Sequence, residues 1–238
     1  IVPVYTATGW GNAAVLGHEG LPVMAAYPYA TWTNITQRSP YCLFTDLRQK
    51  PDYAPVRFNP QEFPSVYAEM GCGIQMGYSA RPEVNPRGVA TMLLRTIGSG
   101  SNGIGYYMYH GGTNPEALMS GGCDDGKYLY LNENQRTLAT NYNDMPVKTY
   151  DFQAPLGEFG QPNPHYYMLR KLHMFMHDYA EVLAPMRAVF PCSQDITKGD
   201  DSHLRWSYRA EGKSGFVFVN NYERLQRLTA KTNVRFSV

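Results

Sequence analysis

Short apolar runs without strict alternation of apolar and polar positions recur along the first part of the chain. They cover residues 2–8, 21–27, 64–70 and 103–110. A strand that is covered on both faces loses the alternation that a half-exposed strand shows. The pattern therefore predicts four buried strands of a parallel sheet.

Helix signals separate these runs. Asn is followed by Pro at Asn59, Asn85 and Asn163, a pair that is typical of a helix N-terminus. After Asn85, apolar residues recur at helical spacing as far as Ile97, and a similar pattern after Asn163 ends by Pro185. Strands that alternate with helices predict an α/β layer with parallel strands and right-handed crossovers.

Beyond residue 185 the pattern changes to a period of two. Leu204, Trp206 and Tyr208 alternate with polar residues, residues 211–214 are typical of a turn, and residues 215–219 form a second apolar run. Two such runs joined by a short turn predict an antiparallel hairpin.

This change divides the chain into two predicted domains. Residues 1–184 form the α/β unit, and residues 185–238 form the incomplete start of an antiparallel β domain, in which residues 234–238 begin a further strand. Within the first unit, residues 115–149 are rich in Gly, Asn and Asp and lack periodicity. Unstructured connections of that length are usually functional loops.

Charge and hydropathy exclude several classes of partner. The formal net charge is +1 and only 17% of residues are charged, which argues against nucleic acid or an anionic membrane as the main partner. No apolar run approaches the roughly 18–20 residues of a membrane span. No signal peptide is visible, and the chain begins at Ile1 without Met, which suggests a processed or partial product and leaves the compartment unknown.

The cysteines favour neither a metal nor a cofactor. Cys42, Cys72, Cys123 and Cys192 contain no C-x-x-C pair, which argues against a zinc site and leaves the disulfide state open. We therefore expect no metal and no cofactor.

Glu69 is the first candidate for chemistry. It ends the third apolar run and is followed by Met-Gly-Cys-Gly, which offers no local counter-charge. Functional groups of α/β enzymes collect at the carboxyl ends of parallel strands, and a carboxylate there can attack an anomeric carbon. The alternative is a structural carboxylate that caps a helix. The 19 tyrosines suit sugar binding, because each joins an apolar ring to a hydroxyl, although many of them equally suit packing.

Three ordered motifs resemble glycoside hydrolase family 35, the β-galactosidases. Residues 106–114, Tyr-Tyr-Met-Tyr-His-Gly-Gly-Thr-Asn, are similar to the last barrel strand and turn of that family. Residues 149–160 are similar to its Ser-Tyr-Asp-Tyr-Asp-Ala-Pro-Leu motif, and Ala68-Glu69 to the end of its strand seven. The resemblance covers nearly the whole chain.

The resemblance implies a (βα)₈ TIM barrel that cleaves terminal β-linked galactose with retention, with Glu69 as the nucleophile. Tyr107 and Tyr150 match tyrosines that line the galactose pocket, where a phenol can hold the rotamer of the carboxylate; core packing is the rival role for Tyr107. Trp10 closes the first run, where its indole either stacks on a sugar or wedges between barrel and loop. A secreted or periplasmic location follows from the resemblance alone.

The chain also departs from the family. Gly71 stands where the family usually has Trp or Tyr, Phe152 replaces a tyrosine, and Gln153 replaces an aspartate, which puts the leaving-group subsite in question. The family's acid/base glutamate follows an Asn at the end of strand four, and no such pair precedes Glu69 on a strand. The other candidate carboxylates of the chain are expected in loops or turns rather than at the end of a neighbouring strand: Glu19, Glu116, Asp124, Asp125, Asp151 and Glu158.

By alignment of the motifs, residues 2–8 correspond to strand five, so the chain would hold strands five to eight and the opening of the β domain. Half a barrel exposes its inner face and an open edge, and it needs its other half, a second copy or another partner. Two hypotheses follow: the nucleophile-bearing half of a β-galactosidase acting on a β-galactoside or related glycan, or a non-catalytic sugar-binding remnant that lacks the acid/base residue.

Overall fold

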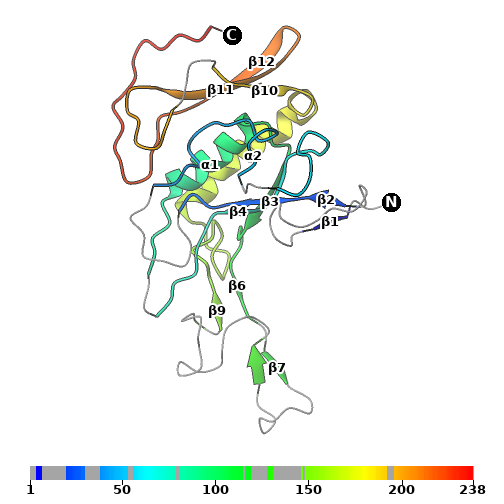
Figure 1. Ribbon diagram of the computed structural model, residues 1–238. Helices are drawn as coiled ribbons and strands as arrows, with labels where there is room; N and C mark the ends of the chain where they lie inside the picture. Colours follow the sequence, from blue (N-terminus) through cyan, green and yellow to red (C-terminus); the bar gives the residue numbers. More distant parts are fainter. Residues whose placement is uncertain are drawn as a thin grey trace.

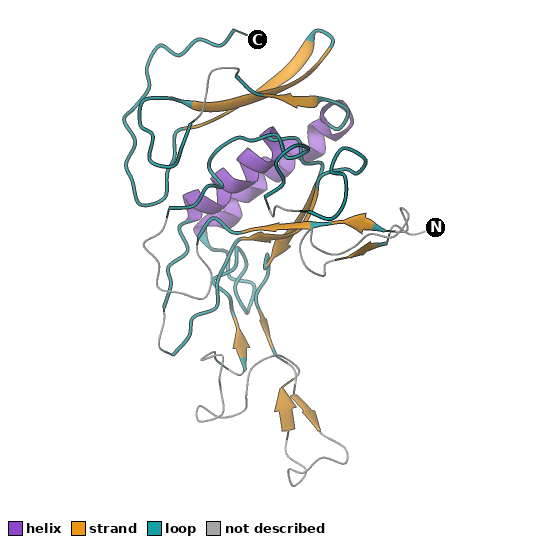
Figure 2. Ribbon diagram, viewed as in Figure 1, coloured by secondary structure: helices purple, strands orange, loops and turns teal. Residues whose placement is uncertain are grey.

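Two helices lie between a set of parallel strands and an antiparallel sheet (Figures 1 and 2). No helix among the described residues is long and apolar enough to cross a membrane. The computed structural model describes residues 4–6, 20–29, 38–52, 56–78, 81–114, 116–118, 128–130, 146, 148–191 and 196–237.

The parallel strands follow one another in chain order. Strands β3 (Met24–Ala26), β4 (Val66–Gly71) and β5 (Gly103–Tyr107) form a parallel sheet in that order. Strand β1 (Tyr5–Thr6) pairs in parallel with β2 (Leu21–Pro22), which leads into β3. The third and fourth apolar runs, predicted as strands of a parallel sheet, are therefore confirmed as parallel strands, and they are neighbours in the sheet.

The described strands form several small sheets and do not close into a barrel. The prediction that the first apolar run, residues 2–8, is buried is wrong for its described part, because Val4 and Tyr5 are 65% and 63% exposed.

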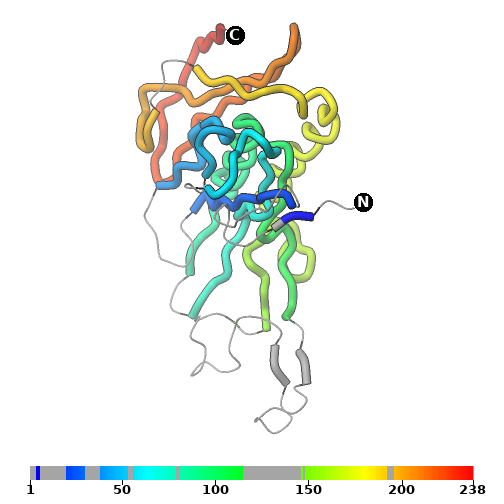
Figure 3. Tube along the Cα trace, turned by 45° about the vertical axis from the view of Figure 1, so that its right-hand side comes forward, coloured from blue at the N-terminus to red at the C-terminus, as the bar shows by residue number. Residues whose placement is uncertain are grey.

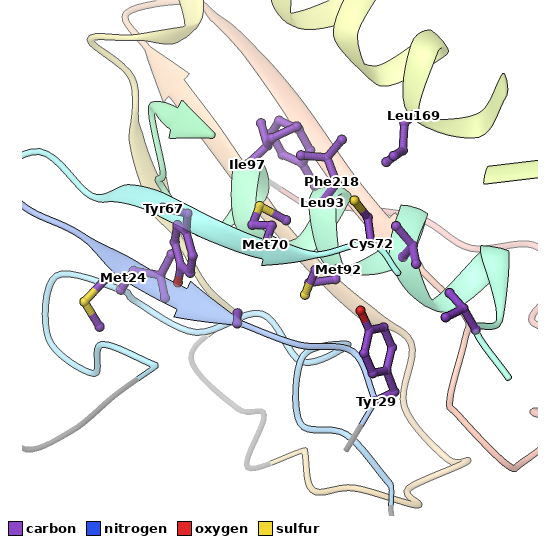
Figure 4. Packing of buried hydrophobic residues seen from close by; sticks show 14 of the residues in the cluster. Met24, Tyr29, Tyr67, Met70, Cys72, Met92, Leu93, Ile97, Leu169 and Phe218 are labelled. Atoms are coloured by element: carbon purple, nitrogen blue, oxygen red, sulfur yellow. The ribbon is translucent and has the colours of Figure 1, made fainter. Parts of the chain in front are cut away.

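Helix α1 (Pro86–Gly98) confirms the second of the three predicted helix starts. The Asn85 side chain accepts a hydrogen bond from the backbone N–H of Arg87 at 2.9 Å, and Pro86 occupies the first turn. The buried face of α1 packs on β4 and on the antiparallel sheet, as Figure 4 shows for Met70, Met92, Leu93, Ile97 and Phe218. At Gly98 a Cβ would lie 2.7 Å from the side chains of Phe44 and Phe218, so only glycine permits this close approach.

Helix α2 (Pro164–Leu183) confirms the third predicted helix, which ends before Pro185, and it packs against α1. The helix predicted after Asn59 is wrong. There the Asn59 side chain accepts from the N–H of Gln61 and donates to Glu62, which closes a turn. Pro64 follows at once, and proline disfavours the helical conformation of the residue before it.

The predicted hairpin is present. Strands β10 (Arg187–Val189), β11 (Arg205–Glu211) and β12 (Ser214–Asn220) form an antiparallel sheet in that order. Its alternation is inverted, however: the polar positions of β11 are buried against the helices, whereas Trp206 and Tyr208 are only half-buried. The strand expected at residues 234–238 is wrong over its described part, where residues 234–237 are irregular.

One arginine explains how polar residues can face inward. Arg209 is buried, and its guanidinium donates to one amide and four backbone carbonyls at the ends of both helices: Asn102, Ile97, Ser101, Leu183 and Met186. Burial lowers its pKa to about 10, so it remains charged at neutral pH. The helix C-termini carry partial negative charge, which suits a cation.

Two short strands near the two ends of the segment between β5 and α2 pair with each other. Strand β6 (Gly112–Thr113) pairs antiparallel with β9 (Thr149–Tyr150), and the pair extends away from the helices (Figures 1 and 3). Strand β7 (Glu116–Leu118) pairs antiparallel with β8 (Tyr128–Tyr130). The described parts of residues 115–149 therefore contain strands, which the lack of periodicity did not predict.

Candidate functional site

Glu69 lies on β4 beside a tyrosine from the neighbouring strand. In the parallel register Ala25 pairs with Glu69, so Tyr27, which follows β3, reaches the carboxylate from the side. Its hydroxyl donates a hydrogen bond to Glu69 Oε2 at 2.5 Å. Burial and, next, this hydrogen bond raise the pKa of Tyr27 well above its usual value, so the phenol keeps its proton and acts as a donor.

Gly71 makes room for that tyrosine. A Cβ at position 71 would lie 2.2 Å from Cδ1 of the Tyr27 ring, well inside any permitted contact. The small residue that distinguishes this chain from the family pattern is therefore coupled to the Tyr27–Glu69 contact. An aromatic ring is still present beside the end of β4, but it comes from the neighbouring strand.

Tyr107 and Tyr150 meet on the other side of β4. Tyr107 ends β5 directly opposite Gly71, and its hydroxyl lies 2.5 Å from the hydroxyl of Tyr150 on β9. Tyr107 is also close enough to contribute to the raised pKa of Tyr27. The structure thus places Tyr27 on the Glu69 carboxylate and Tyr107, which contacts Tyr150, close to Tyr27.

Phe152 supports this pair and explains one departure from the family. Its ring is 3% exposed, stacks on Tyr150 with centroids 5.4 Å apart, and meets Tyr107 edge-on at 5.2 Å. A hydroxyl on a ring buried in this way would need a partner of its own. Phenylalanine avoids that requirement.

Gln153 explains the other departure. Its side-chain nitrogen donates to the carbonyls of Ile74 at 3.1 Å and Pro82 at 2.9 Å, which an ionised aspartate cannot do. The backbone carbonyl of Gln153 accepts a hydrogen bond from Nε2 of His165 at 3.0 Å. Gln153 therefore ties the turn that carries Phe152 to the segment that follows β4.

Two in-chain carboxylates are already engaged in the loop after β9. The carboxylate of Glu158 accepts from the hydroxyls of Thr113 and Thr149, and Oδ1 of Asp151 accepts from the N–H of Glu158 at 2.7 Å and from Gln161. Their position in loops agrees with the sequence. Glu19, Asp124 and Asp125 lie outside the described residues. The expectation of a loop or turn is wrong for Glu116, which begins β7; only its backbone is described.

Several expectations meet the described residues only in part. Trp10 lies outside them, as do Cys123 and Cys192, whereas Cys42 and Cys72 are buried free thiols. Over the described part of the chain, no three His, Cys, Asp or Glu side chains are grouped to hold a metal ion. Sequence reasoning missed Tyr27, although its place at the end of the second apolar run was the same signal that singled out Glu69.

Comparisons with known proteins agree with the motifs. The family described as "Glycosyl hydrolases family 35" matches residues 10–176, a span that contains Glu69, Tyr107 and Tyr150. A curated protein, "Probable beta-galactosidase 2" of Dictyostelium discoideum, is 29% identical over 116 residues, which are 48% of this chain and 12% of that protein. The match therefore spans about an eighth of the length of this relative.

Proposed function

Because the chain belongs to glycosyl hydrolase family 35, we propose that it carries the nucleophile half of a retaining glycoside hydrolase that releases terminal β-linked galactose. The observation that supports this most directly is the 2.5 Å hydrogen bond from Tyr27 to Glu69 at the carboxyl side of the parallel strands. In this proposal the apolar runs up to β5 are strands five to eight of a TIM barrel, and the rest of the barrel comes from another segment or chain.

Tyr27 leaves one carboxylate oxygen for chemistry. It occupies Oε2 of Glu69, whereas Oε1 accepts no hydrogen bond from any described residue. In the first step Oε1 bonds to the anomeric carbon, and the glycosidic oxygen leaves with the bonding electron pair and a proton from an acid. In the second step water attacks the same carbon, gives up a proton, and the ester bond to Oε1 breaks.

The neutral phenol has two tasks in this scheme. Its hydrogen bond holds the Glu69 rotamer, so that Oε1 faces one direction before substrate binds. It also donates a hydrogen bond to the negative charge of the Glu69 carboxylate while the phenol itself keeps its proton. Tyr107 and Tyr150 line the galactose pocket in the proposal, held in place by Phe152.

In this proposal the acid that protonates the leaving group is neither Asp151 nor Glu158. A retaining pair needs its two carboxyl groups about 5–5.5 Å apart. Asp151 is engaged in hydrogen bonds with the loop after β9, and Glu158 in hydrogen bonds with Thr113 of β6 and Thr149 of β9. Because both of these carboxylates are engaged, a second candidate function is retained: a non-catalytic sugar-binding remnant with the same tyrosine pocket.

Covalent trapping tests the nucleophile without needing the acid. The probe is 2,4-dinitrophenyl 2-deoxy-2-fluoro-β-D-galactoside, whose leaving group departs unprotonated. We expect the intact mass to rise by one fluorogalactosyl unit, mapped by peptide sequencing to Glu69, and we expect no adduct in Glu69→Gln. Glu62→Gln, in an exposed turn, is the matched control and should label as the wild type does. Galactose binding without any adduct would favour the remnant.

A further inference from the structure

A cavity of about 330 Å³ lies far from Glu69. It opens between residues 43–50 and the antiparallel sheet. Thr45, one of the residues that line the cavity, lies next to the C-terminus of α1: its backbone N–H donates to Oγ of Ser99, which follows that helix, at 3.2 Å. A crossover helix runs back against its strands, so the C-terminus of α1 lies at the amino ends of β4 and β5. Glu69 lies in the carboxyl half of β4, so the two sites are at opposite ends of the sheet.

The walls of the cavity are aromatic. Phe44, Phe190 and Trp206 all line it, and each is half-buried, so each retains surface that faces the space. The indole of Trp206 is held in place by Tyr208, stacked at 6.2 Å between ring centroids, and by Phe236 at 4.9 Å. A fixed aromatic surface is suited to the C–H face of a sugar ring.

The rim of the cavity is polar and nearly balanced in charge. Asp46, Gln49 and Lys50 line it, and the side chains of Gln49 and Lys50 are exposed and make no hydrogen bond with another described residue. Arg205 also lines the cavity, but its guanidinium is paired with the buried carboxylate of Glu223 at 2.6 Å. One carboxylate and one ammonium remain, so neither an anion nor a cation is favoured.

We propose that this cavity binds one ring of a neutral saccharide, at a site separate from Glu69. The ligand must offer an apolar face to the three aromatic side chains and hydroxyls to the amide, carboxylate and ammonium of the rim. The volume is at the small end of ligand pockets, which run from about 300 Å³, and therefore suits a single ring. This proposal does not depend on Glu69 being a nucleophile.

Indole signals in a ¹⁵N-labelled sample test it directly. The chain has three tryptophans, and Trp206→Phe identifies the signal of Trp206 by its loss. The probes are methyl β-D-galactopyranoside and methyl β-D-glucopyranoside. We expect at least one of them to shift the Trp206 signal with a millimolar dissociation constant, the range expected for a ligand of about a dozen heavy atoms.

Variants separate the rim from the active site. Gln49→Ala combined with Lys50→Ala should weaken binding about tenfold, because two hydrogen bonds are lost. Lys213→Ala, an exposed lysine in the turn between β11 and β12, is the matched control. Glu69→Gln should leave the titration unchanged, so a failure of the proposed catalytic role does not affect this result.

Three outcomes would overturn the proposal. The first is no shift of the Trp206 signal by either glycoside at roughly 100 mM, well above the dissociation constant expected for so small a ligand. The second is an equal shift by cyclohexanol, which would show that the cavity accepts any apolar ring. The third is a shift that depends on protein concentration without sugar, which would show that a second copy covers the cavity.

Discussion

We propose that a single hydrogen bond, from Tyr27 just after β3, sets the geometry of Glu69. Removing the hydroxyl in Tyr27→Phe keeps the ring against Gly71 but frees Oε2, and hydrogen bonds to charged groups are worth about 1.5–3 kcal/mol. We expect the rate of covalent trapping by the fluorogalactoside to fall roughly 10–100-fold. Intact-mass spectrometry of samples quenched at successive times measures this labelling rate.

The control for this prediction is Tyr78→Phe, which removes a hydroxyl from a side chain that is 49% exposed and should leave the rate unchanged. A Tyr27→Phe variant that labels at the wild-type rate would show that the phenol does not position the carboxylate.

We expect His165 to make the free energy of unfolding depend on pH. It is 3% exposed, and burial lowers its pKa in the folded state. Below a pH of about 6.5 the unfolded chain takes up a proton that the folded protein resists, so its contribution to stability is lost as the pH falls through that value. Part of the decrease in the free energy of unfolding between pH 7 and pH 5 should therefore disappear in His165→Gln, which retains a donor for the carbonyl of Gln153.

Urea unfolding at the two pH values measures this difference. The matched control is His177→Gln, because the His177 side chain is 91% exposed. If both variants retain the full pH dependence of the wild type, His165 is not its source.

At the scale of elements, helices and antiparallel sheet are joined by polar contacts. Replacing Arg209 by Met keeps much of the side-chain volume but removes a donor from each of its buried carbonyl partners, of which those of Ile97 and Leu183 keep one backbone N–H donor each. Unsatisfied buried polar groups cost about 1–3 kcal/mol each, and breaking a buried charged network costs about 3–5 kcal/mol. We expect Arg209→Met to lower the free energy of unfolding by roughly 3 kcal/mol.

Arg187→Met, an exposed arginine on the neighbouring strand β10, is the control and should change stability by less than about 0.5 kcal/mol. Similar chemical denaturation curves for the two variants would contradict a structural role for the Arg209 network.

The elements themselves were predictable to different degrees. Helix α1 was found because its cap, its Pro and its apolar spacing are all local. A helix was predicted after Asn59 as well but is not present, because the same cap chemistry closes a turn when Pro64 follows. The inward face of β11 could not be predicted, because alternation indicates two faces without saying which is buried; Arg209 shows that the polar face can be the buried one where helix ends supply acceptors.

At the scale of the whole molecule, the proposed function makes a demand on substrates. An alkoxide leaving group needs a proton, and positioned acid catalysis is worth roughly 10²–10⁴-fold. We expect the 238-residue chain to hydrolyse lactose poorly or not at all, whereas dinitrophenyl galactoside can still form a glycosyl–enzyme. Rates on both substrates, with the purified chain checked by intact mass, measure the difference.

Glu158→Gln serves as the control for an acid within the chain, and its lactose rate should match that of the wild type. Rapid lactose hydrolysis by a chain of confirmed mass would show that an acid lies within these residues, and the half-barrel proposal would then fail.

The sequence by itself determined the local features and the family. Caps, turns and motif order act within a few residues or are compared one position at a time, so α1, α2, the hairpin of β11 and β12, and Glu69 as a candidate could all be found from it. Only the tertiary structure decided which side chains meet. Tyr27 and Glu69 are 42 residues apart, and Tyr107 and Tyr150 are 43 apart. The first contact depends on the register of the parallel strands β3 and β4, and the second on the antiparallel pairing of β6 with β9; long-range packing sets both, and no local pattern records them.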